Sequence, residues 1–109
     1  MLVSEILRIK GHTLFTTAPE RSVLEAVEVM AQHDIGSLVV MDHGKLTGML
    51  TFAEVLRALA ERRGELGSAT VADIFERDPL TAAPGLDVME LRGAMLERHA
   101  RYFPVMEGT

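Results

Sequence analysis

Apolar residues between positions 22 and 33 recur every three or four places, which is the spacing of one buried helix face. Ser22 stands directly before this run and Glu25 lies three positions later, so the pattern predicts a helix with a capping box at its start. The run SLVVM at 37–41 lacks the helical period and predicts a buried strand. In the predicted helix, the residues expected to face the protein core are Val23, Ala26, Val27 and Met30.

The next apolar segments continue this alternation of strand and helix. DHGK at 42–45 predicts a hairpin turn in which Gly44 takes a positive φ. A strand at 46–50 and a helix at 52–62 should follow, with Val55, Leu56 and Leu59 on one face. Further along the chain, a Gly-rich linker at 64–68 and a short helix at 70–76 are predicted.

Thr51 and Glu54 mark the junction between that strand and that helix, in the stretch GMLTFAEV at 48–55. Thr-x-x-Glu before an apolar run is the capping-box pattern, and capping alone explains the pair. A helix N-terminus also presents free N–H groups and a positive dipole to an anionic ligand. The two interpretations are compatible, and the local pattern leaves both open.

The chain repeats this pattern once. TTAPERSVLEAVEVM, starting at Thr16, aligns without gaps with TAAPGLDVMELRGAM, starting at Thr81, at a shift of 65 residues. In the second copy Asp87 is the expected N-cap, Glu90 the matching capping-box residue, and YFPVM at 102–106 the counterpart of the first buried strand. The conserved order of turn, cap and apolar positions indicates an internal duplication.

The repeat defines the expected organisation of the chain as an α+β protein. The first repeat, with an N-terminal helix, should occupy 1–67 and the second 68–109. The second copy reaches Thr109 within its hairpin turn, so we expect it to be truncated, without counterparts of the strand and helix at 46–62. Either the chain is a truncated product, or a partner chain covers the apolar surface that these elements would cover.

Composition narrows the class of protein. The 109 residues carry a net charge of −5, which argues against a general grip on nucleic acid. No apolar run approaches the roughly 20 residues that a membrane helix needs, so no membrane association is expected. The absence of cysteine excludes disulfides and thiol catalysis and fits a cytoplasmic protein. No acid–base or nucleophile arrangement is evident, so we expect a binding protein and not an enzyme.

The repeat, the T-x-x-P motifs, SLVVMD and GMLTFAEV together resemble a tandem pair of cystathionine-β-synthase-type (CBS) domains, the Bateman module, in its small stand-alone bacterial form for signal transduction. The resemblance covers nearly the whole chain. It implies two βαββα repeats packed about a pseudo-two-fold axis, with two clefts between them. It also implies a regulatory module that forms a homodimer, acts on an effector protein that the sequence does not identify, and binds AMP, ADP, ATP, NAD or S-adenosylmethionine.

The resemblance further implies which residues contact the ligand. The family motif G-h-h-T/S-x-x-D matches Gly48, Thr51 and Glu54, although the family's Asp, which takes the ribose hydroxyls, is replaced here by the longer Glu. The clefts are shared between repeats in the family, so Thr51 and Glu54 should face the loop before Pro84. The full expected set is Thr16, Thr17, Gly36, Ser37, Thr51, Glu54, Thr81, Ala82, Arg101 and Tyr102, with Arg101 reaching phosphate.

Three alternatives remain at this stage. The chain could be a structural homodimerisation module with degenerate clefts, which the Glu at 54, the Gly at 36 and the incomplete second copy favour. Arg101 could be an ordinary solvated charge at the start of a strand. A metal-linked sensor is the weakest alternative, because the spacing of the histidines predicts no metal site. The histidines are His12, His33, His43 and His99.

Overall fold

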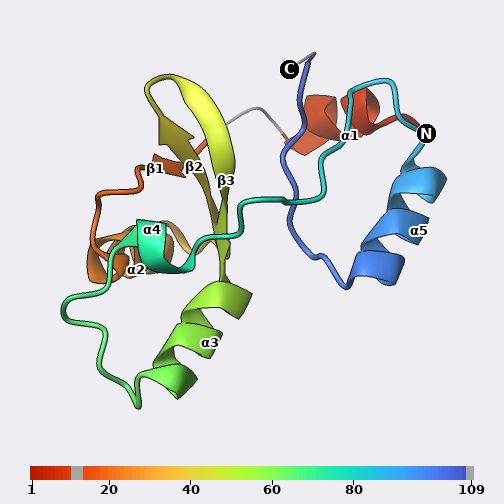
Figure 1. Cartoon of the computed structure of the whole chain (residues 1–109). Coiled ribbons are helices and arrows are strands. Elements are labelled where there is room, and N and C mark those ends of the chain that lie inside the picture. Colours follow the sequence, from red (N-terminus) through yellow and green to blue (C-terminus); the bar gives the residue numbers. More distant parts are fainter. Residues whose placement is uncertain (11–13, 108–109) are drawn as a thin grey trace. The chain divides into compact units, whose positions relative to one another are not determined.

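A computed structural model describes residues 1–10 and 14–107, with side chains for 1–8 and 14–107 (Figure 1). It divides into two compact units. One consists of Phe15–Asp78, and the other combines Met1–Leu14 with Pro79–Thr109. The sequence repeat places the boundary after residue 67, whereas the compact units group the N-terminal segment with the second repeat.

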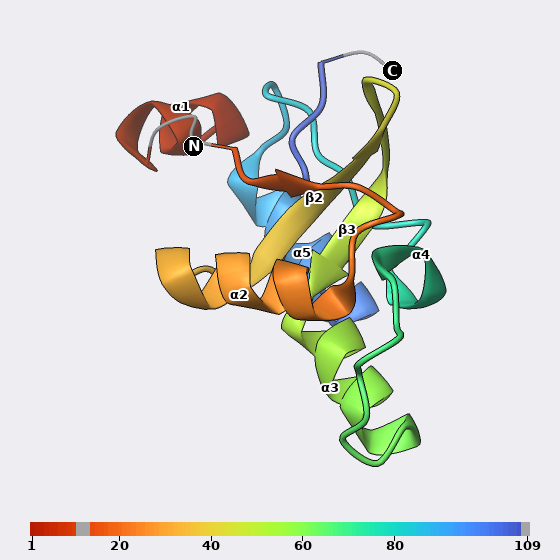
Figure 2. The ribbon, with the colours of Figure 1, turned by 90° about the vertical axis from the view of Figure 1, so that its left-hand side faces the viewer.

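A three-stranded sheet forms the centre of the unit Phe15–Asp78. Its order is β1 (Thr16–Thr17), β2 (Ser37–Asp42) and β3 (Lys45–Thr51), with β1 parallel and β3 antiparallel to β2. The hairpin of β2 and β3 is seen in Figure 2. His43 and Gly44 at its turn both have positive φ, which confirms the expected conformation at Gly44.

Two amphipathic helices accompany this sheet, as the apolar spacing predicts. They are α2 (Val23–His33) and α3 (Phe52–Glu61). Val23, Ala26 and Met30 of α2 are buried, and one side of the sheet contributes Leu38, Val40 and Leu50 to the core. One expectation for α3 is wrong: the side chain of Leu56 is 65% exposed, and Ala58 is buried with Val55. Positions 55 and 58 are a helical turn apart, whereas position 56 is rotated by about 100°.

The helix expected at 70–76 is shorter in the structure, where α4 spans only Val71–Ile74. It ends because the chain turns extended at Phe75, with φ −68° and ψ 152°. Glu76 then pairs with Met49 of β3 through two backbone hydrogen bonds of 2.8 and 2.9 Å. Pairing with the sheet edge therefore replaces the last turn of the predicted helix.

The other unit contains two helices, α1 (Val3–Lys10) and α5 (Val88–Arg98). Its core is formed by Val3, Ala82 and Leu91, with half-buried apolar side chains around them. Both α2 and α5 contain 11 residues, and the described residues include no longer helix. No helix in the described part of the chain is long and apolar enough to cross a membrane.

The strand predicted at 102–106 does not form, and this prediction is wrong. Within this segment Val105 makes a single bridge to the described part of the chain, to Ala82. Pro104 has no N–H to donate to a ladder. In addition, no neighbouring hairpin strand pairs with 102–106 among the described residues, whereas β2 has β3 beside it.

Candidate functional site

Thr51 and Glu54 form a reciprocal capping box at the start of α3. The Ala53 N–H donates to Thr51 Oγ1 at 3.2 Å, and the Thr51 N–H donates to Glu54 Oε1 at 2.8 Å. The Thr51 hydroxyl also donates to Glu54 Oε2 at 3.1 Å. The capping interpretation of the pair is therefore confirmed, and the hydroxyl and both carboxylate oxygens take part in it.

Glu54 is the buried charged side chain among the described residues, at 8% exposure. The N-terminus of a helix favours a carboxylate, because the free N–H groups there carry partial positive charge. Two donors from Thr51 also offset the cost of its desolvation. Each carboxylate oxygen accepts one of these bonds and retains a lone pair, so Glu54 can still accept a hydrogen bond from a ligand hydroxyl.

Gly36 and Ser37, at the start of β2, lie beside this capping box. The Phe52 N–H donates to the Gly36 carbonyl at 3.2 Å, and Ser37 is the strand partner of Thr51. Gly36 is buried and Ser37 is half-buried. The structure thus brings together four of the predicted site residues at the open end of the β2–β3 hairpin: Gly36, Ser37, Thr51 and Glu54.

Thr16 and Thr17 lie on β1, at the other edge of the same sheet. Thr16 pairs with Val39 and Thr17 with Val40. Ser37 and Val39 are two residues apart and share a face of β2, so their partners Thr51 and Thr16 share that face too. Thr16 is exposed to solvent, and Thr17 is half-buried.

The remaining predicted residues belong to the second unit. Thr81 is exposed, whereas Ala82 is 5% exposed, and its backbone is bonded to Pro104 O at 3.0 Å and to Met106 N at 2.7 Å. Arg101 is exposed and Tyr102 half-buried. Ala82 therefore has its N–H and one carbonyl lone pair engaged within the unit. The expectation that Thr51 and Glu54 face the Thr81 loop stays a prediction.

Gly48, the first residue of the family motif, has a steric role that the sequence pattern does not reveal. A Cβ at this position would lie 2.0 Å from the Glu76 carbonyl oxygen and 2.7 Å from Phe75 Cδ2. The segment that follows α4 can thus approach β3 only because position 48 has no side chain. The Arg77 guanidinium lies over the Phe75 ring, 4.2 Å from its centroid, on the same segment.

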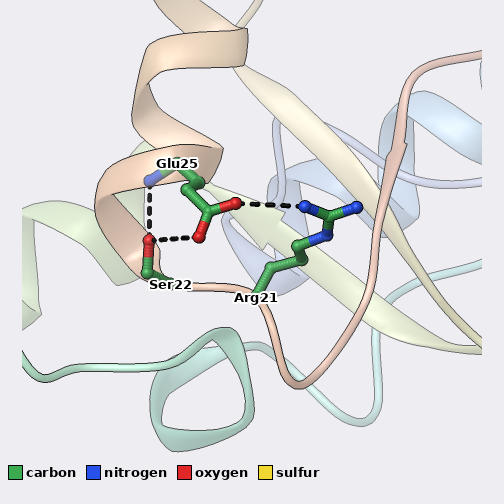
Figure 3. A network of polar contacts seen from close by, with 3 residues as sticks. All are labelled: Arg21, Ser22 and Glu25. Atoms are coloured by element: carbon green, nitrogen blue, oxygen red, sulfur yellow. Dashed lines mark hydrogen bonds and ion pairs between the residues drawn. The ribbon is translucent and has the colours of Figure 1, made fainter.

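A second polar network marks the start of α2 and is shown in Figure 3. Ser22 is the N-cap, as predicted: its hydroxyl accepts from the Glu25 N–H at 3.0 Å and donates to the Glu25 carboxylate at 3.2 Å. Arg21 forms an ion pair with Glu25 at 3.1 Å. The hydrogen bonds from Arg21, first, and Ser22 hold the pKa of Glu25 below its ordinary value of 4.5. The sequence spacing predicts the Ser22–Glu25 pair. Arg21 lies four residues before Glu25, a spacing at which opposite charges pair on helices, and its ion pair adds a third residue to the network.

The histidines lie apart from these groups. His33 packs against Phe15 with the two rings tilted by 34° and their centroids 4.5 Å apart, and the exposed His43 contacts Asp42 at 2.8 Å. His99 is the C-cap of α5, and His12 lies outside the described residues. Within the ranges 1–10 and 14–107, no three His, Asp or Glu side chains form a group that could hold a metal ion.

Comparison with known proteins gives a consistent result. The CBS domain pattern matches residues 3–61. CBS domain-containing protein YhcV of Bacillus subtilis is 27% identical over 93 residues, covering 84% of this chain and 65% of its own length. The chain thus spans slightly less than two thirds of this relative.

Solved structures agree over almost all of the chain. The CBS-domain protein ATU1752 from Agrobacterium tumefaciens matches with a TM-score of 0.94 at 25% identity, over 99% of this chain and 86% of that one. The CBS domain pair of MJ0100, in complex with 5′-methylthioadenosine and S-adenosylmethionine, matches with a TM-score of 0.85 at 28% identity, over 98% of this chain and 81% of that one. The chain belongs to the CBS domain family.

Proposed function

We propose that this chain is a regulatory module that binds an adenosine-containing molecule, with Thr51 and Glu54 contacting its ribose. The observation that carries the proposal is the cluster around Glu54, a buried carboxylate beside Thr51, Gly36 and Ser37. Support comes from the CBS domain pair of MJ0100, which was solved with two adenosine compounds. The ligands considered are AMP, ADP, ATP, NAD, S-adenosylmethionine and 5′-methylthioadenosine.

The charge of Glu54 bears on which part of the ligand lies here. A carboxylate accepts hydrogen bonds from ribose hydroxyls, whereas a phosphate beside it would be repelled. Glu54 also already occupies the positive end of α3 that would otherwise attract an anion. We therefore assign the nucleoside end of the ligand, and not a phosphate group, to Thr51 and Glu54.

Regulation follows if the ligand prefers one arrangement of the molecule, because a ligand shifts an equilibrium only by its difference in affinity for the two states. The output would be read by a partner, and we propose a homodimer acting on an effector protein. The apolar residues Phe52 and Leu56, exposed by 51% and 65% on α3, support association with another copy. The cytoplasm as its location is a prediction from the lack of cysteine.

The experiment is thermal unfolding with each of the six compounds at millimolar concentration. A ligand at 100 times its dissociation constant adds about 2.7 kcal/mol to the free energy of unfolding. The proposal requires a concentration-dependent rise in melting temperature with at least one compound. If none of the six produces a rise, the proposal is wrong.

Paired variants separate ligand contact from helix capping. Thr51→Val removes the hydroxyl that caps α3, and Ser22→Ala removes the one that caps α2, each at a cost of about 1 kcal/mol. Only Thr51→Val should also weaken ligand binding, by about tenfold for one lost hydrogen bond to a polar ligand group. Equal affinities in the two variants would show that Thr51 is a cap and nothing more.

A structural homodimerisation module is the second candidate function. The capping box favours it, because the capping role fully accounts for why Thr51 and Glu54 stand here. It predicts a dimer by light scattering whose stability does not respond to any of the six compounds. The ligand-binding proposal predicts the same dimer with a response.

A further inference from the structure

The segment that begins the chain is hydrogen-bonded to the loop that precedes α5. The Val3 N–H donates to Leu86 O and the Ser4 N–H to Pro84 O, both at 2.9 Å. In return, the Val88 N–H donates to Met1 O at 2.8 Å. In Figure 1, the segment leading into α5 runs beside α1.

These bonds satisfy backbone groups that each helix leaves unpaired at its own start. Val3 and Ser4 are the first two residues of α1, and Val88 is the first residue of α5. The first four N–H groups of a helix have no partner inside that helix. Each helix therefore depends on the other segment to complete its N-terminal turn.

Side-chain burial joins the same two segments. Val3 is 3% exposed and lies in one apolar cluster with Ala82 and Leu91, each 5% exposed, while Leu7 packs at its side. Ala82 is the residue after Thr81 in the loop before Pro84. α1 thus packs against that loop, and the loop backbone is also hydrogen-bonded to Pro104 and Met106 through Ala82.

We propose that α1 is a positioning element for the loop 80–86, with Val3 as the residue that locks it in place. Among the described residues, the loop makes no strand pairing apart from the bridge between Ala82 and Val105, so its shape depends on what docks against it. When α1 is docked, the loop backbone is held both by α1 and by Pro104 and Met106. When α1 is released, Pro84 O, Leu86 O and the Val88 N–H all lose their partners together.

The coupling to a ligand rests on the proposed function together with the sequence-based prediction that Thr81 is among the residues that contact the ligand. A ligand that binds only the ordered loop also stabilises the docked state of α1, since coupling between two equilibria is reciprocal. The helix would then report occupancy of this loop. Release of α1 weakens binding, and binding protects α1 from release.

The test compares Val3→Ala with Val23→Ala. Both remove two methyl groups from a valine that is at most 3% exposed near the start of a helix, but Val23 belongs to the other unit. Hydrogen exchange of the full chain should show the amides of Val3, Ser4 and Val88 exchanging at least about tenfold faster in Val3→Ala. Val23→Ala should leave these amides unchanged and accelerate those of its own unit. Leu7→Ala, a milder change at a half-buried position, replaces Val3→Ala if that variant does not fold.

Affinities for S-adenosylmethionine and AMP complete the experiment. The proposal predicts weaker binding of at least one of them in Val3→Ala than in Val23→Ala, and slower exchange of Val3 and Ser4 when that compound is bound to the native chain. Faster exchange with no binding of either compound to the native chain would support the positioning role and count against the proposed function. Unchanged exchange of the Val88 amide in Val3→Ala would overturn the positioning role of α1. Equal affinities of Val3→Ala and Val23→Ala, when both variants are folded and bind the compound, would overturn the coupling of α1 to ligand binding.

Discussion

The two repeats carry the same pattern after their first helix, yet residues 37–51 form a hairpin and residues 102–106 form a single bridge. β2 has hydrogen-bonding partners on both sides, β1 and β3. Val105 pairs only with Ala82 among the described residues, and Pro104 interrupts the segment. An apolar run thus becomes a strand only when neighbouring segments complete its hydrogen bonds.

The same contrast appears in how the two units are closed. The unit Phe15–Asp78 closes through segments of its own, since Glu76 pairs with Met49 at the edge of β3. The other unit is closed by residues from the opposite end of the chain, through the bonds of Val3 and Ser4. Two repeats of similar sequence can therefore form compact units that are completed by different segments of the chain.

The largest effect is expected from alanine at Gly48, which tests how the first unit is closed. A Cβ there would lie 2.0 Å from Glu76 O, so the pairing of Glu76 with Met49 must break or β3 must shift. Gly48→Ala should lower the free energy of unfolding by about 3 kcal/mol or more. Gly93→Ala, in the middle of α5 with nothing within 4 Å of its Cβ, should raise it by about 1 kcal/mol. Urea unfolding measures both, and a mild effect at Gly48 would contradict the described packing.

A smaller effect is expected when the two repeats are compared at equivalent valines. Val40 of β2 is fully buried, whereas its counterpart Val105 is only half-buried. Val40→Ala should cost about 2 kcal/mol, and Val105→Ala less than about 1 kcal/mol. Hydrogen exchange within each unit reports these costs separately. Equal costs would show that 102–106 is as well packed as β2, against the difference described above.

The smallest effect concerns pH and the network at the start of α2. The hydrogen bonds from Arg21 and Ser22 lower the pKa of Glu25 below 4.5 in the folded chain. Its contribution to stability is then complete above pH 4.5 and is lost as the pH falls through the lower, folded pKa. Glu25→Gln should abolish this part of the acid dependence, and Glu90→Gln at the repeat-equivalent position of α5 is the matched control. An NMR titration of the Glu25 carboxyl group with a midpoint at or above 4.5 would refute the prediction.

Much of the fold follows from local patterns in the sequence. Helices begin after Ser22, Thr51 and Asp87, as predicted. The side chain of such a capping residue accepts a hydrogen bond from a backbone N–H only two or three residues later in the chain, so this feature is local. The turn at Gly44 is equally local. These features need no knowledge of distant segments.

Several features that the sequence did not reveal depend on contacts between distant segments. The shortening of α4 comes from Met49, more than twenty residues away in the chain. The grouping of α1 with the second repeat comes from bonds between Val3 and Leu86. In the candidate site, the spacing of Thr51 and Glu54 predicts the capping box. The closeness of these residues to Gly36 and Ser37 follows only from the register of β2 with β3, which the sequence does not reveal.

We propose that Thr51 and Glu54 contact an adenosine ligand as well as capping α3. The most direct measurement is a proton–nitrogen NMR titration of the chain with S-adenosylmethionine and 5′-methylthioadenosine. Contact of the ligand with Thr51 and Glu54 predicts saturable shifts of the Thr51, Ala53 and Glu54 amides, which lie in and beside the capping box. Those amides should stay unshifted in Glu54→Ala. Saturable binding that leaves these three amides unmoved in the native chain, or no binding of either compound, would contradict the claim.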